Sequence, residues 1–270
     1  MKGKRKTAAL LVLTAALLAG CNGVSQERQA AREKGITLLD AGDHEGAVRE
    51  FEAALADTDK VSEFEIDVLK YRAQAEYLLE DHTAALHTYS ILKQIDGERA
   101  EYSYLSAICA AENGDTEEAL LELEAGRALD EKHHSGETKS SGYREAVLAL
   151  GNAFRKAGAV EEAQETYKEL LNSPYESTEI YNCLALLSME QGQYEAALEY
   201  IGRGRKLSDE VSAKELAFNE AVCMEYMGRF HEALSLFEDY AEQYGSDERV
   251  EHEIAFLTIL CKNSPILSRS

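Results

Sequence analysis

The feature that most constrains this chain is a short phrase that recurs six times along it. Each copy contains a glycine or its substitute, then polar or aromatic residues, and ends with an alanine. The copies are AGDHEGA (41–47), EDHTAA (80–85), NGDTEEA (113–119), AGAVEEA (157–163), QGQYEAA (191–197) and MGRFHEA (227–233). Such self-similarity indicates an array of stacked units, none of which can bury its apolar face alone.

The copies recur at a nearly regular spacing. The turn residue falls at positions 42, 80, 114, 158, 192 and 228, with Glu80 in place of glycine, so the steps are 38, 34, 44, 34 and 36 residues. The composition also favours helix, because alanine, leucine and glutamate are abundant and only two prolines occur. We therefore expect the repeated units to be helical.

Small and large residues recur in register with these turns. A small residue seven positions before each turn residue is Gly35, Ala73, Ala107, Gly151, Ala185 or Ala221. A second small residue, five positions after each turn residue, is Ala47, Ala85, Ala119, Ala163, Ala197 or Ala233, and the large residue four positions later is Phe51, Tyr89, Leu123, Tyr167, Ile201 or Phe237. We expect the small residues to let the helices approach and the large ones to fill the space between repeats.

These units resemble the tetratricopeptide repeat, a 34-residue helix, tight turn and second helix. The resemblance covers roughly residues 28 to 245, although the family's tryptophan is absent and its proline is matched only by Pro174. It implies an all-α fold, a right-handed α-solenoid of about six helix-turn-helix repeats with a C-terminal cap helix. It also implies a concave groove, lined by the first helices, that binds a protein or peptide.

The pattern divides the chain into seven segments. We expect a signal peptide (1–20), a lipid-anchored tether (21–27), repeats 1–3 (28–129), an inter-repeat loop (130–143), repeats 4–6 (144–246), a capping helix (247–262) and a frayed tail (263–270). The loop, a polar run in the 44-residue step, separates the two halves as either a hinge or merely a long connection. The capping helix carries Val250, Ile254, Leu257 and Leu260 at helical spacing.

Counting along the first helices gives candidate partner-binding residues on the concave face. They are Lys70, Gln74, Tyr77, Tyr104, Asn152, Arg155, Asn182, Met189, Phe218, Asn219 and Tyr226. Three asparagines in successive repeats, Asn152, Asn182 and Asn219, offer donors and acceptors to the backbone of an extended peptide. The alternative interpretation is that they are ordinary polar residues on helix surfaces.

The first 21 residues have the layout of an export signal. Lys2, Lys4, Arg5 and Lys6 precede an apolar stretch from Thr7 to Leu18. That stretch is shorter than the roughly 20 residues that span a bilayer. The sequence Leu18-Ala19-Gly20-Cys21 resembles the lipobox of bacterial lipoproteins, which implies lipidation of Cys21 and anchoring to the cell membrane on its extracytoplasmic side. An ordinary signal peptide with cysteine after the cut is the alternative.

Charge and cysteine usage narrow the classes of partner and site. Without the four cations of the signal, 24 Lys and Arg face 50 Asp and Glu, so the mature chain is near −26. This charge argues against nucleic acid and fits a basic partner or simple solubility. Cys109, Cys183, Cys223 and Cys261 are widely spaced in apolar surroundings, which favours four free, buried thiols over a disulfide framework.

No motif in the sequence indicates catalysis, a cofactor or a metal. The chain has no Gly-x-Ser-x-Gly, no phosphate-binding loop and no helical pair of histidines, and the adjacent His133 and His134 lie in the polar loop. We therefore predict a membrane-anchored scaffold for protein–protein interaction, in envelope assembly, secretion or surface-complex organisation, and not an enzyme. The alternative is a solute- or peptidoglycan-binding accessory lipoprotein of a transporter or remodelling enzyme.

Overall fold

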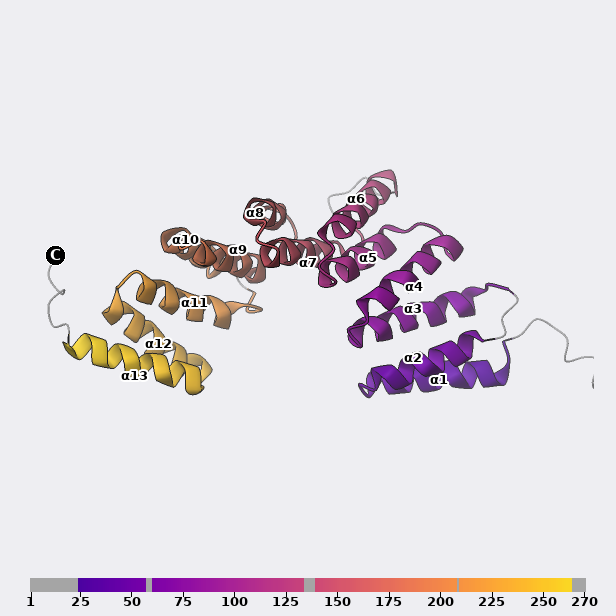
Figure 1. The fold of residues 1–270 in the computed structure, drawn as a ribbon, viewed down its shortest axis with the longest axis horizontal. Helices are drawn as coiled ribbons and strands as arrows, with labels where there is room; N and C mark the ends of the chain where they lie inside the picture. Colours follow the sequence, from indigo (N-terminus) through magenta and orange to yellow (C-terminus); the bar gives the residue numbers. More distant parts are fainter. Residues whose placement is uncertain (1–23, 57–59, 134–138, 208, 264–270) are drawn as a thin grey trace, which may run out of the picture. The chain divides into compact units, whose positions relative to one another are not determined.

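The computed structural model describes residues 24–56, 60–133, 139–207 and 209–263 (Figure 1). In these residues the chain forms thirteen α-helices and no strand. They group into two compact units that divide between Asp96 and Gly97. The predicted signal peptide, Cys21 and residues 264–270 of the predicted tail lie outside the described residues.

Unit 1 consists of two helical hairpins. Its helices are α1 (Gln26–Asp40), α2 (His44–Leu55), α3 (Glu63–Leu78) and α4 (His82–Ile95). Within each hairpin the two helices pack together, and α2 and α3 join one hairpin to the next. Figure 1 draws this unit in indigo and purple.

Unit 2 consists of four hairpins and a final helix. Its helices are α5 (Ala100–Glu112), α6 (Thr116–His133), α7 (Tyr143–Lys156), α8 (Val160–Lys168), α9 (Thr178–Glu190), α10 (Tyr194–Gly204), α11 (Ala213–Tyr226), α12 (Phe230–Tyr244) and α13 (Glu248–Asn263). Each hairpin packs on the next, and α13 packs on α12. Val250 and Leu257 of α13 are buried, so the helix covers the end of the array as its periodicity predicted.

The hairpins close on the small residues that the sequence pattern identified. All twelve small positions are buried, and so are the six large residues that follow them. A Cβ atom added to Gly35 would lie only 2.6 Å from Cε1 of Phe51, and one on Gly151 would meet the ring of Tyr167 in the same way. An aromatic ring therefore lies directly on the backbone of the facing helix, which no larger residue would permit.

The turns between paired helices need a left-handed residue. Gly42 has a φ of 82° and Gly158 a φ of 76°, and Glu80 takes the same place with a φ of 63°. The backbone amide of Glu80 donates to the carbonyl of Tyr77 at 2.9 Å, which closes the end of α3. Glu80 therefore adopts the conformation of the missing glycine, at the cost of Cβ crowding.

The long step between repeats 3 and 4 is not where the structure divides. Helix α6 continues to His133, and α5 packs directly on α7. The carboxylate of Asp130 is buried and accepts hydrogen bonds from the Tyr104 hydroxyl, at 2.7 Å, and from the amide and hydroxyl of Ser140. Helices α5 to α9 therefore share one core across the loop at 130–143, where we expected the two halves to separate. The boundary between the two units lies one repeat earlier, between Asp96 and Gly97.

A part-buried ion pair joins the three helices at the start of unit 1. Arg28 donates to the Ala54 carbonyl of α2 at 2.6 Å and to Glu65 of α3 at 2.6 Å. Glu65 also accepts from the hydroxyl and amide of Ser62, in a capping box. Burial alone would raise the pKa of Glu65, but the bonds from Ser62 and Arg28 lower it from 4.5 to about 2.

Replacing Glu80 by glycine should stabilise unit 1. Glu80→Gly removes the crowding of a left-handed Cβ, and the greater freedom of the unfolded glycine offsets part of the gain, so we expect about 0.5–1 kcal/mol. Urea unfolding followed by circular dichroism measures the change. Gly42→Ala, the reverse exchange in the equivalent turn, should destabilise by a similar amount. Lower stability of Glu80→Gly would contradict this account of the turn.

Replacing Glu65 should destabilise unit 1 in a pH-dependent way. Glu65→Gln leaves Arg28 without its anionic partner, so we expect a loss of roughly 2 kcal/mol at pH 7. Because the folded pKa is depressed, this contribution is present above about pH 4.5 and disappears as the pH falls toward 2. Denaturant unfolding with hydrogen exchange of α3 amides, from pH 7 to pH 2.5, measures it.

Glu63→Gln is the matched control, because this exposed carboxylate lies in the same first turn of α3. We expect it to change the stability by less than about 0.5 kcal/mol. An equal loss of stability in both variants would show that the Arg28–Glu65 pair contributes no more to folding than an exposed carboxylate in the same turn.

Candidate protein-interaction surface

Polar side chains one repeat apart connect the first helices of consecutive hairpins. In unit 2, Arg155 of α7 pairs with Glu190 of α9, 35 residues later, and Asn219 of α11 donates to Asn182 of α9 at 2.8 Å. In unit 1, Arg32 of α1 pairs with Asp67 of α3 at 2.6 Å, also 35 residues later. The same face of each first helix thus contacts the next at a spacing close to the repeat length.

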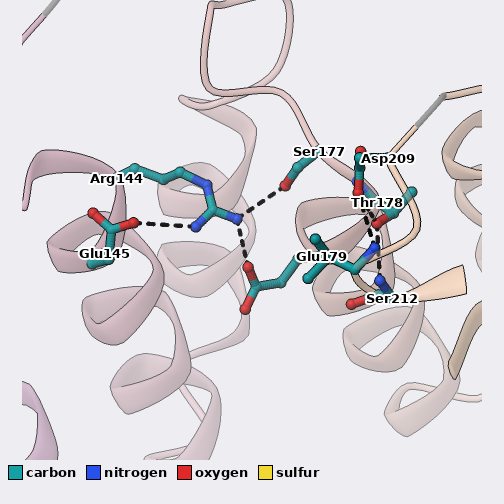
Figure 2. A network of polar contacts seen from close by, with 8 residues as sticks. Arg144, Glu145, Ser177, Thr178, Glu179, Asp209 and Ser212 are labelled. Atoms are coloured by element: carbon teal, nitrogen blue, oxygen red, sulfur yellow. Dashed lines mark hydrogen bonds and ion pairs between the residues drawn. The ribbon is translucent and has the colours of Figure 1, made fainter.

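A denser network fixes the beginnings of the first helices in unit 2 (Figure 2). The Arg144 guanidinium donates to Glu179, and to the Ser177 hydroxyl at 3.1 Å. Beside it, the carboxylate of Asp209 accepts from the amide of Thr178, at 3.0 Å, and from its hydroxyl. Figure 2 shows Arg144 and Glu179 pointing toward each other next to this second cluster.

Electrostatics stabilise the charged forms of this network. Burial alone would raise the pKa of Asp209, but the hydrogen bonds from the Thr178 hydroxyl and amide lower it below its ordinary value. Burial alone would lower the pKa of Arg144, yet its bond and its attraction to Glu179 raise it. The amide of Ser212 completes the network by donating to the Thr178 hydroxyl at 3.0 Å. The register of α7, α9 and the start of α11 is therefore set by polar contacts as well as by the core.

The candidate residues of repeat 2 lie in unit 1, on α3. Lys70 and Gln74 are exposed, and the Lys70 ammonium lies 3.7 Å from the carboxylate of Asp96. Tyr77 is half-buried, and its ring packs against His82 with 5.2 Å between ring centroids. These three residues belong to a different unit from the other candidates.

Tyr104 does not lie on a binding face, which corrects the sequence-based assignment. Its ring is fully buried, and its hydroxyl donates to Asp130. A Cβ atom on Gly126 of α6 would collide with this ring, so the glycine makes the space that Tyr104 fills. Burial and the bond to Asp130 raise the pKa of Tyr104 above its ordinary value. Helical counting cannot separate such a residue from a groove residue one position away.

Asn152 and Arg155 both form polar contacts with other residues of the repeats. The hydroxyl of Tyr167 donates to the side-chain carbonyl of Asn152 at 2.8 Å, and Arg155 pairs with Glu190. Met189 packs against the core between α9, α10 and α11. Tyr226 is 68% exposed and stacks on Tyr194, with 5.1 Å between centroids and 14° between planes.

Asn182, Phe218 and Asn219 do converge. They line a pocket of about 370 Å³ between α9, α11, α12 and the first turn of α13. The other lining residues are Leu186, Lys214, Glu215, Tyr240, Asp247 and Arg249. We call this set the α11–α13 pocket.

The floor of the α11–α13 pocket is aromatic. The Phe218 ring meets Phe237 and Tyr240 edge to face, at centroid distances of 5.4 and 5.6 Å. The guanidinium carbon of Arg249 lies 3.6 Å from the Phe218 centroid, and the Lys214 ammonium lies 5.9 Å from the Tyr240 centroid. Lys214, Tyr240 and Arg249 are not among the residues that the repeat pattern singles out, because Lys214 lies at the very start of a first helix and the other two lie on α12 and α13.

The four cysteines of the described residues are not paired in disulfides. Cys109 and Cys223 are buried, Cys183 and Cys261 are half-buried, and all four are free thiols. Burial raises the pKa of Cys183 and of Cys223 to about 11.

Within the described residues no three His, Cys, Asp or Glu side chains are grouped to hold a metal, and no helix is long and apolar enough to cross a membrane. His134 and the His133 side chain lie outside this description.

Removing Asn152 should weaken folding and not only binding. Asn152→Ala takes the acceptor from the Tyr167 hydroxyl at a part-buried site, so we expect a loss of about 1 kcal/mol in chemical unfolding. Combined with Tyr167→Phe, which removes the donor, the same change should cost clearly less than it does alone. Strictly additive losses in this double-mutant cycle would contradict a direct interaction.

Comparison with known proteins is consistent with this geometry. The tetratricopeptide-repeat family model matches residues 32–99 and 148–206. Among curated proteins, the BBSome complex member BBS4 of Bos taurus is 25% identical over 136 residues, which are 50% of this chain and 24% of that protein. The chain thus spans about a quarter of the length of that relative.

Solved structures show the same fold. A tetratricopeptide repeat protein from Parabacteroides merdae superposes with a TM-score of 0.57 at 17% identity, covering 93% of this chain and 91% of that one. PilW, described as a type IV pilus biogenesis factor, gives a TM-score of 0.60 at 16% identity, covering 87% and 99%. With its repeat register, its α-solenoid hairpins and these matches, the chain is a tetratricopeptide-repeat protein.

Proposed function

We propose that this protein is a scaffold that is exported, held at a membrane by a lipid on Cys21, and binds a segment of a partner protein in unit 2. The fold is one that serves protein–protein interaction, which implies protein or peptide partners. The observation that carries the proposal is the α11–α13 pocket, where amides, aromatic rings and charged groups of α9, α11, α12 and α13 converge.

The two asparagines suit recognition of a peptide backbone. Asn219 uses a side-chain N–H to bond the carbonyl of Asn182. The side-chain N–H groups of Asn182 and the side-chain carbonyl of Asn219 make no hydrogen bond in the described part of the chain. A peptide unit offers one acceptor and one donor, so it complements this pair.

The rigidity of the surrounding helices favours binding. The Arg144–Glu179 and Thr178–Asp209 contacts fix the start of α9, and Ser212 ties the start of α11 to it. A surface that is ordered before binding loses little conformational entropy when a partner docks. The network in Figure 2 therefore supports a preformed site.

Membrane anchoring is supported by the sequence alone. The apolar stretch from Thr7 to Leu18 and the Leu18-Ala19-Gly20-Cys21 sequence suit export and lipid transfer. A diacyl thioether supplies two chains, which is enough for stable attachment. The net charge near −26 of the chain without its signal peptide would keep such a protein soluble above the membrane, away from polyanions such as nucleic acid.

Partner binding can be tested with a photo-cross-linker at two exposed glutamates. A cross-linking amino acid in place of Glu215, which lines the pocket, should give a covalent adduct in cells. The same amino acid in place of Glu199, on the exposed face of α10, should not. Leu186→Glu, inside the pocket, should reduce the adduct at least about tenfold by placing a desolvated charge there.

Leu121→Glu is the matched control, because Leu121 is 63% exposed on α6, away from the pocket. It should leave the adduct unchanged. Equal adducts from positions 215 and 199 would contradict the assignment of the binding site. Equal effects of the two leucine variants would contradict it as well.

Lipid anchoring predicts a simple change in location. Cys21→Ser removes the thiol that carries the lipid, so the protein should lose radiolabelled palmitate and leave the membrane fraction. Cell fractionation and metabolic labelling measure both. The residue after Cys21 is Asn22, so no adjacent thiol can take over the lipid. Normal membrane retention of Cys21→Ser would therefore contradict the lipoprotein proposal.

A further inference from the structure

We propose that the α11–α13 pocket selects a partner segment with a single carboxylate beside an apolar side chain. This inference rests on the proposed function and specifies its ligand. The carboxylate would lie between Lys214 and Arg249, and the apolar side chain would lie against the aromatic floor. The partner is thus a weakly acidic, amphipathic peptide segment, although the chain itself is strongly acidic.

The two cations of the pocket have no internal anionic partner. Arg144 and Arg155, on neighbouring surfaces, each pair with a glutamate. In the part of the chain that the structure describes, no carboxylate forms an ion pair with Lys214 or Arg249. Both line the pocket, so their charge faces the space where a ligand would bind.

The positions of these cations are unfavourable for the helices that carry them. Lys214 is the second residue of α11, and Arg249 is the second residue of α13. Backbone amides make a helix N-terminus positive, so acidic residues stabilise it and basic residues do not. Two cations that do not stabilise their own helices therefore lie at one pocket, where they can attract an anion.

Arg249 is oriented for a carboxylate by the ring below it. Its guanidinium carbon lies 3.6 Å from the Phe218 centroid, so the ring supports the cation while its N–H groups remain free to donate. Phe218 is itself held by Phe237 and Tyr240. A guanidinium held in this way can donate two parallel hydrogen bonds to a carboxylate.

The acidic residues of the pocket limit the ligand to one carboxylate. Asp247 accepts the amide of Val250 at 3.0 Å and so caps α13, and Glu215 lies in the first turn of α11. A second acidic group on the ligand would approach one of these carboxylates and be repelled. The pocket therefore disfavours polyacidic segments.

The test is a selection of displayed random dodecapeptides on the immobilised full-length protein. Enriched peptides should carry one Asp or Glu next to a leucine, isoleucine, valine or phenylalanine. The strongest of them, labelled with fluorescein, is then titrated by fluorescence anisotropy. Replacing its acidic residue by the corresponding amide should weaken binding at least about tenfold, the scale of one charge-assisted contact.

Charge-matched variants make the titration specific. Lys214→Gln combined with Arg249→Gln should weaken the acidic peptide about tenfold or more and should bind the acidic and amide peptides equally. Lys168→Gln combined with Lys206→Gln, two exposed lysines outside the pocket, removes the same charge and should change affinity less than about twofold. Thermal unfolding by circular dichroism verifies that each variant is folded.

The outcomes separate this inference from the proposed function. Enriched peptides that lack acidic residues but lose binding with Leu186→Glu would overturn the carboxylate proposal and leave the binding site standing. Equal weakening by both lysine–arginine and lysine–lysine variants would also overturn it, because general electrostatics would then explain the effect. Enrichment of no peptide would contradict the proposed function as well.

Discussion

The structure depends on large side chains that lie directly on glycine backbones of the facing helix. Phe51 on Gly35 and Tyr167 on Gly151 are two such contacts within a hairpin. Tyr104 on Gly126 reverses the arrangement, with the ring on the first helix and the glycine on the second. Because a Cβ atom at any of these glycines would overlap the ring, helix separation is set by the backbone itself.

Close packing then determines where polar groups can meet. When consecutive first helices stack, residues about 35 positions apart become neighbours, as with Arg32 and Asp67 or Arg155 and Glu190. The denser network around Arg144 and Asp209 fixes the start of α9, and Asn182 and Leu186 of the same helix line the α11–α13 pocket. The shape of the pocket is therefore set by contacts that stabilise the packing of the helices. Lys214 and Arg249 differ from those structural cations because no carboxylate of the described residues pairs with them.

The repeat pattern in the sequence predicts the fold better than it predicts the binding site. The turn residues, including the substitution of Glu80 for glycine, and both series of small residues are placed as the repeat pattern predicted. Of the candidate residues, Asn182, Phe218 and Asn219 share one pocket, whereas Tyr104 is buried and Asn152 serves Tyr167. Counting gives the face of a helix to within about one residue, and one residue on a helix is a rotation of about 100°. That rotation separates the core from the surface.

The sequence by itself determined the helical hairpins, their register and the residues on which they close, because these follow from local spacing of glycine, alanine and large apolar side chains. Only the tertiary structure decided the boundary at Asp96 and the convergence of α9, α11 and α13 on one pocket. The physical reason is that these features depend on pairs of side chains from different helices. Tyr104 with Asp130, or Arg249 with Phe218, meet only after the helices have packed.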